Sequence, residues 1–156
     1  MKGFTMVELI MVIVIIGILA STAAMRWPTG MREEAAFQEF KRSVRQAQHQ
    51  AMTRRFDETT PGKAWGIVVN ANQYTIRRAD NSETAEAEYV NRTLPGNAAI
   101  SNGAVYFNGL GVPLDAAGNQ LAAALVFTVS GDGDGSGTSL TVCPQTGYAQ
   151  RGSSCP

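Results

Sequence analysis

The chain has 156 residues, which is enough for one domain with a modest hydrophobic core. Its 13 Lys and Arg residues balance 13 Asp and Glu residues, so no net charge draws the protein as a whole to nucleic acid or to anionic lipid. Hydrophobic residues make up 44% of the chain but are unevenly spread, because Leu9–Ala20 contains no polar side chain. This apolar run is the first feature that any interpretation has to explain.

The N-terminal segment has the length of a membrane-spanning helix. As a helix, Phe4–Met25 extends about 33 Å, which matches the hydrocarbon core of a bilayer at about 30 Å. Lys2 is the only charge that precedes it, so the positive-inside rule places the N-terminus in the cytoplasm and the C-terminus outside. The alternative is a cleaved secretory signal peptide. In that case Ser21–Ala24 would be the cleavage site.

Glu8 interrupts the apolar pattern near its start. An ionised carboxylate within a membrane costs about 2.5–3.5 kcal/mol on insertion scales. The simplest explanation is that the Glu8 side chain reaches the lipid headgroups and interacts favourably with the positive end of the helix dipole. That explanation suffices for an isolated membrane anchor, but the residues around Glu8 indicate a further role.

Gly3-Phe4-Thr5-Met6-Val7-Glu8-Leu9, followed by an apolar run, resembles the signal of type IV prepilins and of type II secretion pseudopilins. The resemblance implies a leader of residues 1–3, cleavage between Gly3 and Phe4 by a prepilin peptidase, and methylation of the new N-terminal Phe4. It also implies that Glu8 pairs with the Phe4 amine of a neighbouring subunit in the apolar core of a filament. Each charge would be costly if buried alone, so the pair would set the axial register of the subunits.

A second helix is expected after a break at Trp27–Gly30, because Pro28 removes a backbone donor and disfavours helix at the residue before it. From Met31 an apolar stripe with helical spacing runs along the chain, and this helix should end near Phe56. The stripe consists of Phe37, Phe40, Val44, Ala47 and Ala51.

The remaining residues favour β-structure. Trp65–Val69 and Tyr74–Arg78 read as a hairpin, and the acidic segment Asp80–Glu88 reads as a loop. Further strand candidates are Ala104–Asn108, Leu125–Val129 and Leu140–Cys143. The predicted fold class is α+β, with a long N-terminal helix whose second half packs on an antiparallel sheet to form a head of residues 26–156. The type IV pilin family is built in the same way.

Cys143 and Cys155 are predicted to form a disulfide that closes a C-terminal loop outside the cytoplasm. In the chain-entropy model such a loop contributes about 3 kcal/mol. Zinc is not expected, because the spacing of the cysteines is unsuitable and His49 is the only histidine. Asp132 and Asp134 alternate as calcium ligands do, but the twelfth position of such a loop is Cys143 instead of Glu, so a flexible loop is favoured and no cofactor is expected.

A second resemblance concerns the subtype. Phe37-x-x-Phe40 with Val44-Arg45-x-Ala47, together with Phe107–Asp115 and Val142-Cys143, is similar to minor pilins and pseudopilins of the H-type, FimT-like group and to the minor pilins of mannose-sensitive haemagglutinin pili. The sequence therefore predicts a minor pilin or pseudopilin of a type IV pilus or type II secretion filament. Its expected partners are other pilin subunits, the prepilin peptidase and an inner-membrane assembly platform.

Two alternatives stay open, and an enzyme is not expected. A major pilin for adhesion or motility has the same signal, and a DNA-binding competence pilin could use basic residues of the second helix. A neutral net charge and a C-terminal region with only Arg151 argue against DNA binding. No Gly-x-Ser-x-Gly motif or phosphate-binding loop occurs. The basic candidates are Lys41, Arg42, Arg45, Arg54 and Arg55.

Overall fold

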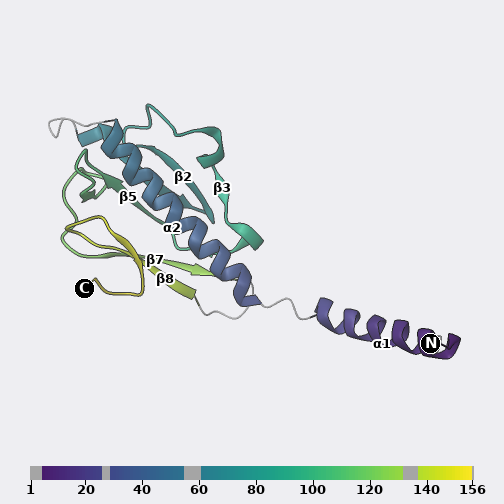
Figure 1. Cartoon of the computed structure of the whole chain (residues 1–156). Helices are drawn as coiled ribbons and strands as arrows, with labels where there is room; N and C mark the ends of the chain where they lie inside the picture. Colours follow the sequence, from purple (N-terminus) through teal and green to yellow (C-terminus); the bar gives the residue numbers. More distant parts are fainter. Residues whose placement is uncertain (1–4, 26–28, 55–60, 132–136, 156) are drawn as a thin grey trace.

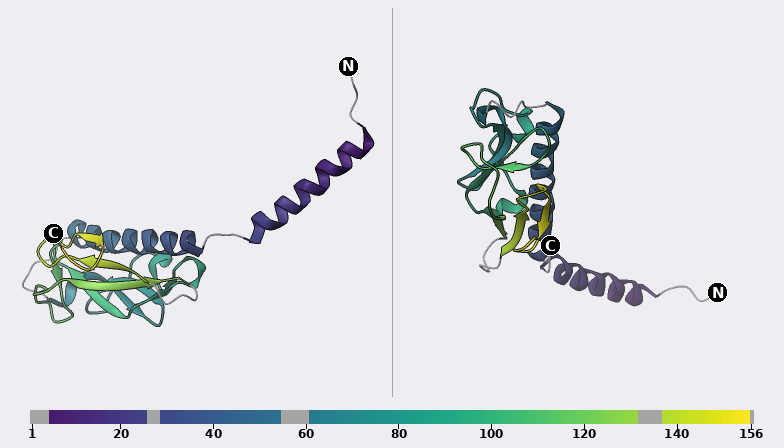
Figure 2. Two further views of the ribbon diagram at one scale, coloured as in Figure 1. Left: turned by 90° about the horizontal axis from the view of Figure 1, so that it is seen from below. Right: turned by 90° about the vertical axis from the view of Figure 1, so that its left-hand side faces the viewer.

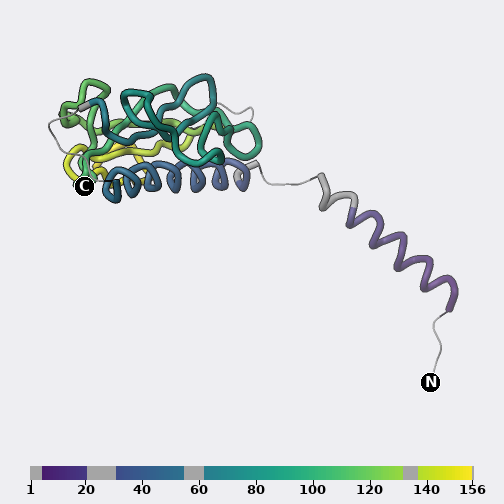
Figure 3. Tube along the Cα trace, turned by 90° about the horizontal axis from the view of Figure 1, so that it is seen from above, coloured from purple at the N-terminus to yellow at the C-terminus, as the bar shows by residue number. Residues whose placement is uncertain are grey.

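The computed structural model describes residues 5–25, 29–54, 61–131 and 137–155. Two helices come first, α1 (Met6–Met25) and α2 (Thr29–Thr53). Figures 1 and 3 show α1 standing away from a head in which α2 lies against the strands. Pro28 and Phe56, on which the predicted break and the predicted helix end depend, lie outside the described residues.

The surface of α1 from Met6 to Ala20 is largely apolar and exposed. Every residue from Met6 to Ala20 is exposed, and among them are Leu9, Ile13 and Leu19. Large exposed apolar patches on a protein surface mark sites of contact with a membrane or with another protein. In the described part of the chain, no helix meets the combined requirement of length and apolar character for crossing a membrane.

In the part of the head that the structure describes there are nine strands, and each pairs with its neighbours in antiparallel fashion. A five-stranded sheet has the order β3-β2-β1-β5-β6, and a four-stranded sheet has the order β4-β7-β8-β9. The strands of the first sheet are β1 (Trp65–Asn70), β2 (Gln73–Arg78), β3 (Arg92–Thr93), β5 (Gly103–Phe107) and β6 (Pro113–Leu114). Those of the second are β4 (Ala99–Ile100), β7 (Leu125–Ser130), β8 (Gly137–Val142) and β9 (Ala149–Arg151). Short 3-10 helices occupy Pro61–Lys63, Ala87–Tyr89 and Pro95–Asn97.

The predicted α+β fold is confirmed, and the sheet is divided in two. Figure 2 shows α2 lying along one face of both sheets. All five residues of the predicted stripe are buried, with at most 1% of each exposed, because they share the face of α2 that meets the strands. The strands β3, β4, β6 and β9 were not predicted, since two or three residues are too few to show the alternation typical of a strand.

Phe40 of α2 contacts both sheets. Its ring meets Tyr74 of β2 edge-on with the centroids 5.9 Å apart, and it meets Phe127 of β7 in the same manner at 5.3 Å. Such edge-to-face pairs contribute about 0.5–1.5 kcal/mol beyond the burial of their area. One side chain of α2 therefore holds a strand from each sheet.

The predicted hairpin is present, and its turn has the geometry that a tight hairpin needs. Ala71 and Asn72 both have positive φ, at 49° and 63°. Positive φ at both central positions is the mark of a type I′ turn, whose twist matches that of the flanking strands. The Ala71 amide donates a hydrogen bond of 3.1 Å to the side-chain oxygen of Asn102. This contact ties the turn to the residue that precedes β5.

Gly66 in β1 is required by the close approach of β5. A Cβ added at Gly66 would lie 2.2 Å from the carbonyl oxygen of Val105 and 2.5 Å from a ring carbon of Tyr106. We expect Gly66→Ala to lower the free energy of unfolding by about 3 kcal/mol, the upper end for overpacking, as measured by thermal unfolding. Gly62→Ala is the matched control, because its Cβ would meet only Asp80 at 3.4 Å. Equal stability of the two variants would contradict this account of β1.

Candidate assembly segment and polar cavity

Thr5 caps the start of α1. The Glu8 amide donates a hydrogen bond of 3.3 Å to Thr5 Oγ1, and the Leu9 amide donates one of 3.2 Å to the Thr5 carbonyl oxygen. Thr5 is therefore the N-cap residue and Glu8 occupies the third helical position, the spacing of a capping box. Glu8 is exposed in the first turn, where a carboxylate also interacts favourably with the helix dipole.

This cap, which uses the backbone amide of Glu8, was not predicted, although the Thr-x-x-Glu spacing is visible in the sequence. Gly3 and Phe4, the predicted cleavage and methylation site, lie outside the described residues. The structure thus places Glu8 in the first turn of an exposed apolar helix. The pairing of Glu8 with a neighbouring chain stays a prediction.

The predicted disulfide between Cys143 and Cys155 is present, with the two Cα atoms 5.7 Å apart. It closes a loop that includes β9 and packs along α2. The side-chain amide of Gln48 donates to the carbonyl oxygens of Thr146 at 3.2 Å and Gly111 at 2.9 Å. The bond to Thr146 fastens the C-terminal loop to α2, and the bond to Gly111 fastens the turn after Phe107 to the same side chain.

Two of the basic residues considered for DNA binding, Arg45 and Arg54, and also Arg151 of the C-terminal region, are engaged within the head. Arg151 forms an ion pair with Glu34 and stacks over the ring of Phe37 at 4.4 Å. Arg45 lies over Tyr148 at 5.7 Å, and Arg54 lies over Trp65 at 4.8 Å. Hydrogen bonds from Gln38 and then from Arg151 lower the pKa of the Glu34 carboxyl. Of the other candidates, Lys41 is half-buried, Arg42 borders a cavity, and Arg55 lies outside the described residues.

Neither metal candidate can be placed, because Asp132 and Asp134 lie outside the described residues. Across residues 5–25, 29–54, 61–131 and 137–155, no three His, Cys, Asp or Glu side chains gather as a metal site would require. His49 is exposed on α2.

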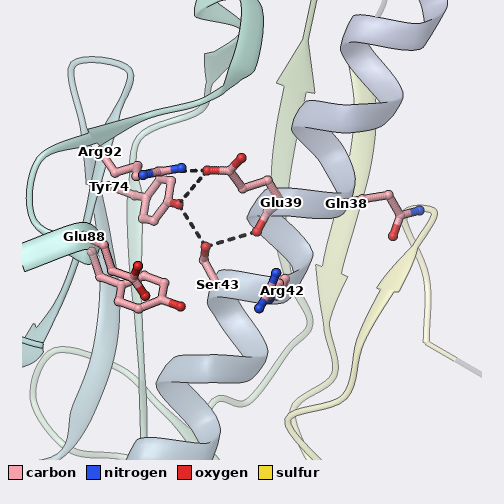
Figure 4. Close-up of a pocket in the computed structure, with 8 residues that line it drawn as sticks. Gln38, Glu39, Arg42, Ser43, Tyr74, Glu88 and Arg92 are labelled. Atoms are coloured by element: carbon pink, nitrogen blue, oxygen red, sulfur yellow. Dashed lines mark hydrogen bonds and ion pairs between the residues drawn. The ribbon is translucent and has the colours of Figure 1, made fainter. Parts of the chain in front are cut away.

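A polar cavity of about 330 Å³ opens between α2, β2 and the segment from Glu88 to Arg92 (Figure 4). The carboxylate of Glu39 accepts hydrogen bonds from Arg92 Nε at 2.9 Å and from the Tyr74 hydroxyl at 3.3 Å. Ser43, which is buried, donates to the Tyr74 hydroxyl at 3.0 Å. Burial raises the pKa of Tyr74, and the hydrogen bond from Ser43 opposes this shift. Its contact with Glu39 raises the pKa of Arg92.

The sequence did not point to this cavity. Tyr74 lies 31 residues from Ser43 and 35 from Glu39, and Arg92 lies 53 residues from Glu39. No local pattern of residue types connects these segments. Their polar side chains meet only because β2 and the chain leading to β3 fold against the same stretch of α2.

Residues 1–24 match the family model of the prokaryotic N-terminal methylation motif. This match supports a type IV pilin-like protein. The α+β architecture, with an N-terminal helix packed on antiparallel strands, is consistent with the type IV pilin fold. No curated protein and no solved structure matches the chain.

Proposed function

We propose that this protein is a structural subunit of a type IV pilus or of a type II secretion filament, in the role of a minor pilin or pseudopilin. The observation that carries the proposal is the match of residues 1–24 to the methylation motif. The exposed apolar surface of α1 supports it, because such a surface needs either lipid or other apolar helices around it. The subunit waits as a precursor in the bacterial inner membrane through Phe4–Met25 and then enters the filament.

Assembly in this proposal depends on the N-terminal residues. The prepilin peptidase removes residues 1–3 and methylates Phe4, and the Leu9–Ala24 helix joins the apolar filament core. The Glu8 carboxylate then pairs with the Phe4 amine of a neighbouring subunit. Glu8 is suited to this role because it is exposed in the first turn of α1. The work of the filament is mechanical, and no enzymatic activity is proposed.

The finer assignment to the H-type, FimT-like group rests on residue patterns of the head. Phe37 and Phe40 of that pattern are buried on α2. The turn after Phe107 is held by Asn108, whose side chain accepts from the amides of Leu110 and Val112 at 2.9 Å each. Among the alternatives, DNA binding gains little support, since Arg45, Arg54 and Arg151 are engaged with aromatic rings of the head.

Mass spectrometry of the mature N-terminus tests the proposal. The protein, expressed with a prepilin peptidase and recovered from the membrane fraction, is expected to lack residues 1–3 and to carry one methyl group on the amine of Phe4. A Gly3→Val variant provides the control and should stay unprocessed, because the residue before the cleavage site is changed. A native chain that keeps Met1–Gly3 and never enters a fibre would overturn the assignment.

A further inference from the structure

The polar cavity of Figure 4 has no part in the assembly role proposed for α1. Its volume of about 330 Å³ lies in the range of small-molecule pockets. A second hollow of about 490 Å³ shares Glu39, Glu88 and Arg92 with it and continues along the backbone toward Pro95. The two hollows together form one groove on the head.

On one side of the cavity the polar side chains already form hydrogen bonds with one another and are held in place. Glu39 is held by Arg92 and by Tyr74, and Tyr74 is held in turn by Ser43 (Figure 4). Ser43 and Tyr74 are almost fully buried, so they cannot move without opening the core. This network provides a fixed wall, as a binding site requires.

Two further groups that border the cavity have no ion-pair partner among the described residues. Arg42 and Glu88 border the cavity and are exposed, and neither forms a salt bridge with any residue that the structure describes. A guanidinium group only donates hydrogen bonds, whereas a carboxylate only accepts them. A ligand between Arg42 and Glu88 must therefore accept on one side and donate on the other.

The composition of the lining restricts the class of ligand. Two arginines and two glutamates border the cavity, so neither an anion nor a cation finds a net opposite charge there. Every lining side chain carries a polar group beside an apolar stem or ring, so a wholly apolar ligand would leave those polar groups without hydrogen bonds. Hydroxyl groups both donate and accept, and several of them on one neutral molecule match this lining.

We propose that the cavity binds a neutral carbohydrate unit. Sugar hydroxyls accept hydrogen bonds from Arg42 and donate them to Glu88, while the bonded wall of Glu39, Tyr74 and Ser43 sets the shape of the site. The adjoining hollow beside Arg92 gives room for a second sugar ring. This assignment does not depend on the role of α1, so it stands or fails separately from the filament proposal.

Binding can be measured by ligand-detected NMR on the full chain in dodecylphosphocholine micelles, since detergents with sugar headgroups would compete for the site. The probes are the methyl glycosides of glucose, galactose, mannose and N-acetylglucosamine, with their disaccharides. We expect at least one to bind with a Kd of about 1 mM. Arg42→Gln and Glu88→Gln should each weaken that binding about tenfold, as expected for the loss of a hydrogen bond to a charged group.

Arg45→Gln and Glu86→Gln are the matched controls, because both residues are exposed near the same elements but do not border the cavity. They should bind as the unchanged chain does, and circular dichroism should show all four variants folded. Sialic acid and glucosamine serve as charged probes and should bind no more tightly than the neutral sugars. The proposal is wrong if no neutral sugar binds at about 100 mM, a hundredfold above the expected Kd. It is also wrong if the control variants lose binding equally or if only a charged probe binds.

Discussion

Glu8→Ala is expected to leave the chain in the membrane but to reduce its incorporation into filaments by at least about a hundredfold. In the proposed filament, removal of Glu8 leaves the Phe4 amine of a neighbouring subunit buried without a counter-charge. Breaking such a pair costs about 3–5 kcal/mol, and each 1.4 kcal/mol corresponds to a factor of about ten. The measurement is the amount of the subunit in sheared filaments relative to the membrane fraction.

The cap formed by Thr5 makes a sharper comparison possible. A glutamine at position 8 can still take part in a capping box, but it carries no charge. Glu8→Gln should therefore fail in assembly as Glu8→Ala does, whereas Thr5→Ala, which removes only a cap of about 1 kcal/mol, should assemble far better. Normal assembly of Glu8→Gln would mean that Glu8 acts only within its own helix, and the register role would be lost.

Phe40→Ala is expected to lower the free energy of unfolding of the head by about 3–5 kcal/mol. Phe40 is fully buried and contacts Tyr74 from one sheet and Phe127 from the other, so its loss leaves a cavity where α2 meets both sheets. For a chain of this size the midpoint of thermal unfolding should fall by about 6–20 °C. Near-ultraviolet circular dichroism of the full chain in micelles follows this transition.

Leu110→Ala is the matched control for the loss of a large apolar side chain. Leu110 is 75% exposed at the tip of the turn that Asn108 holds. Its truncation should change the free energy of unfolding by no more than about 0.5 kcal/mol. A comparable loss of stability in both variants would show that Phe40 does not hold the two sheets together.

Predictions that depend on neighbouring residues along the chain agree well with the structure. The apolar stripe of α2 is visible because helical spacing repeats every few residues, and all five of its members are buried. The hairpin of β1 and β2 was predicted from two apolar runs and the short turn between them. The disulfide followed from the presence of only two cysteines close to the C-terminus.

Predictions that depend on distant pairing were incomplete. The division into two sheets is decided by which strands pair, and β1 pairs with β5 across more than thirty residues of intervening chain. The short strands β3 and β4 exist because longer neighbours, β2 and β7, offer them a pairing edge. The contact of the Arg54 guanidinium with the Trp65 ring likewise could not be predicted from the sequence.

The amino-acid sequence by itself determined that this protein begins with an apolar helix bearing one acid, and that an amphipathic helix and a β-rich head follow. Those properties depend on residues a few positions apart, so local chemistry is enough to specify them. Only the tertiary structure decided that Arg92 and Tyr74 meet Glu39, and that Arg42 and Glu88 border the same cavity. Such groups are distant along the chain, and burial of the apolar face of α2 is what brings them together.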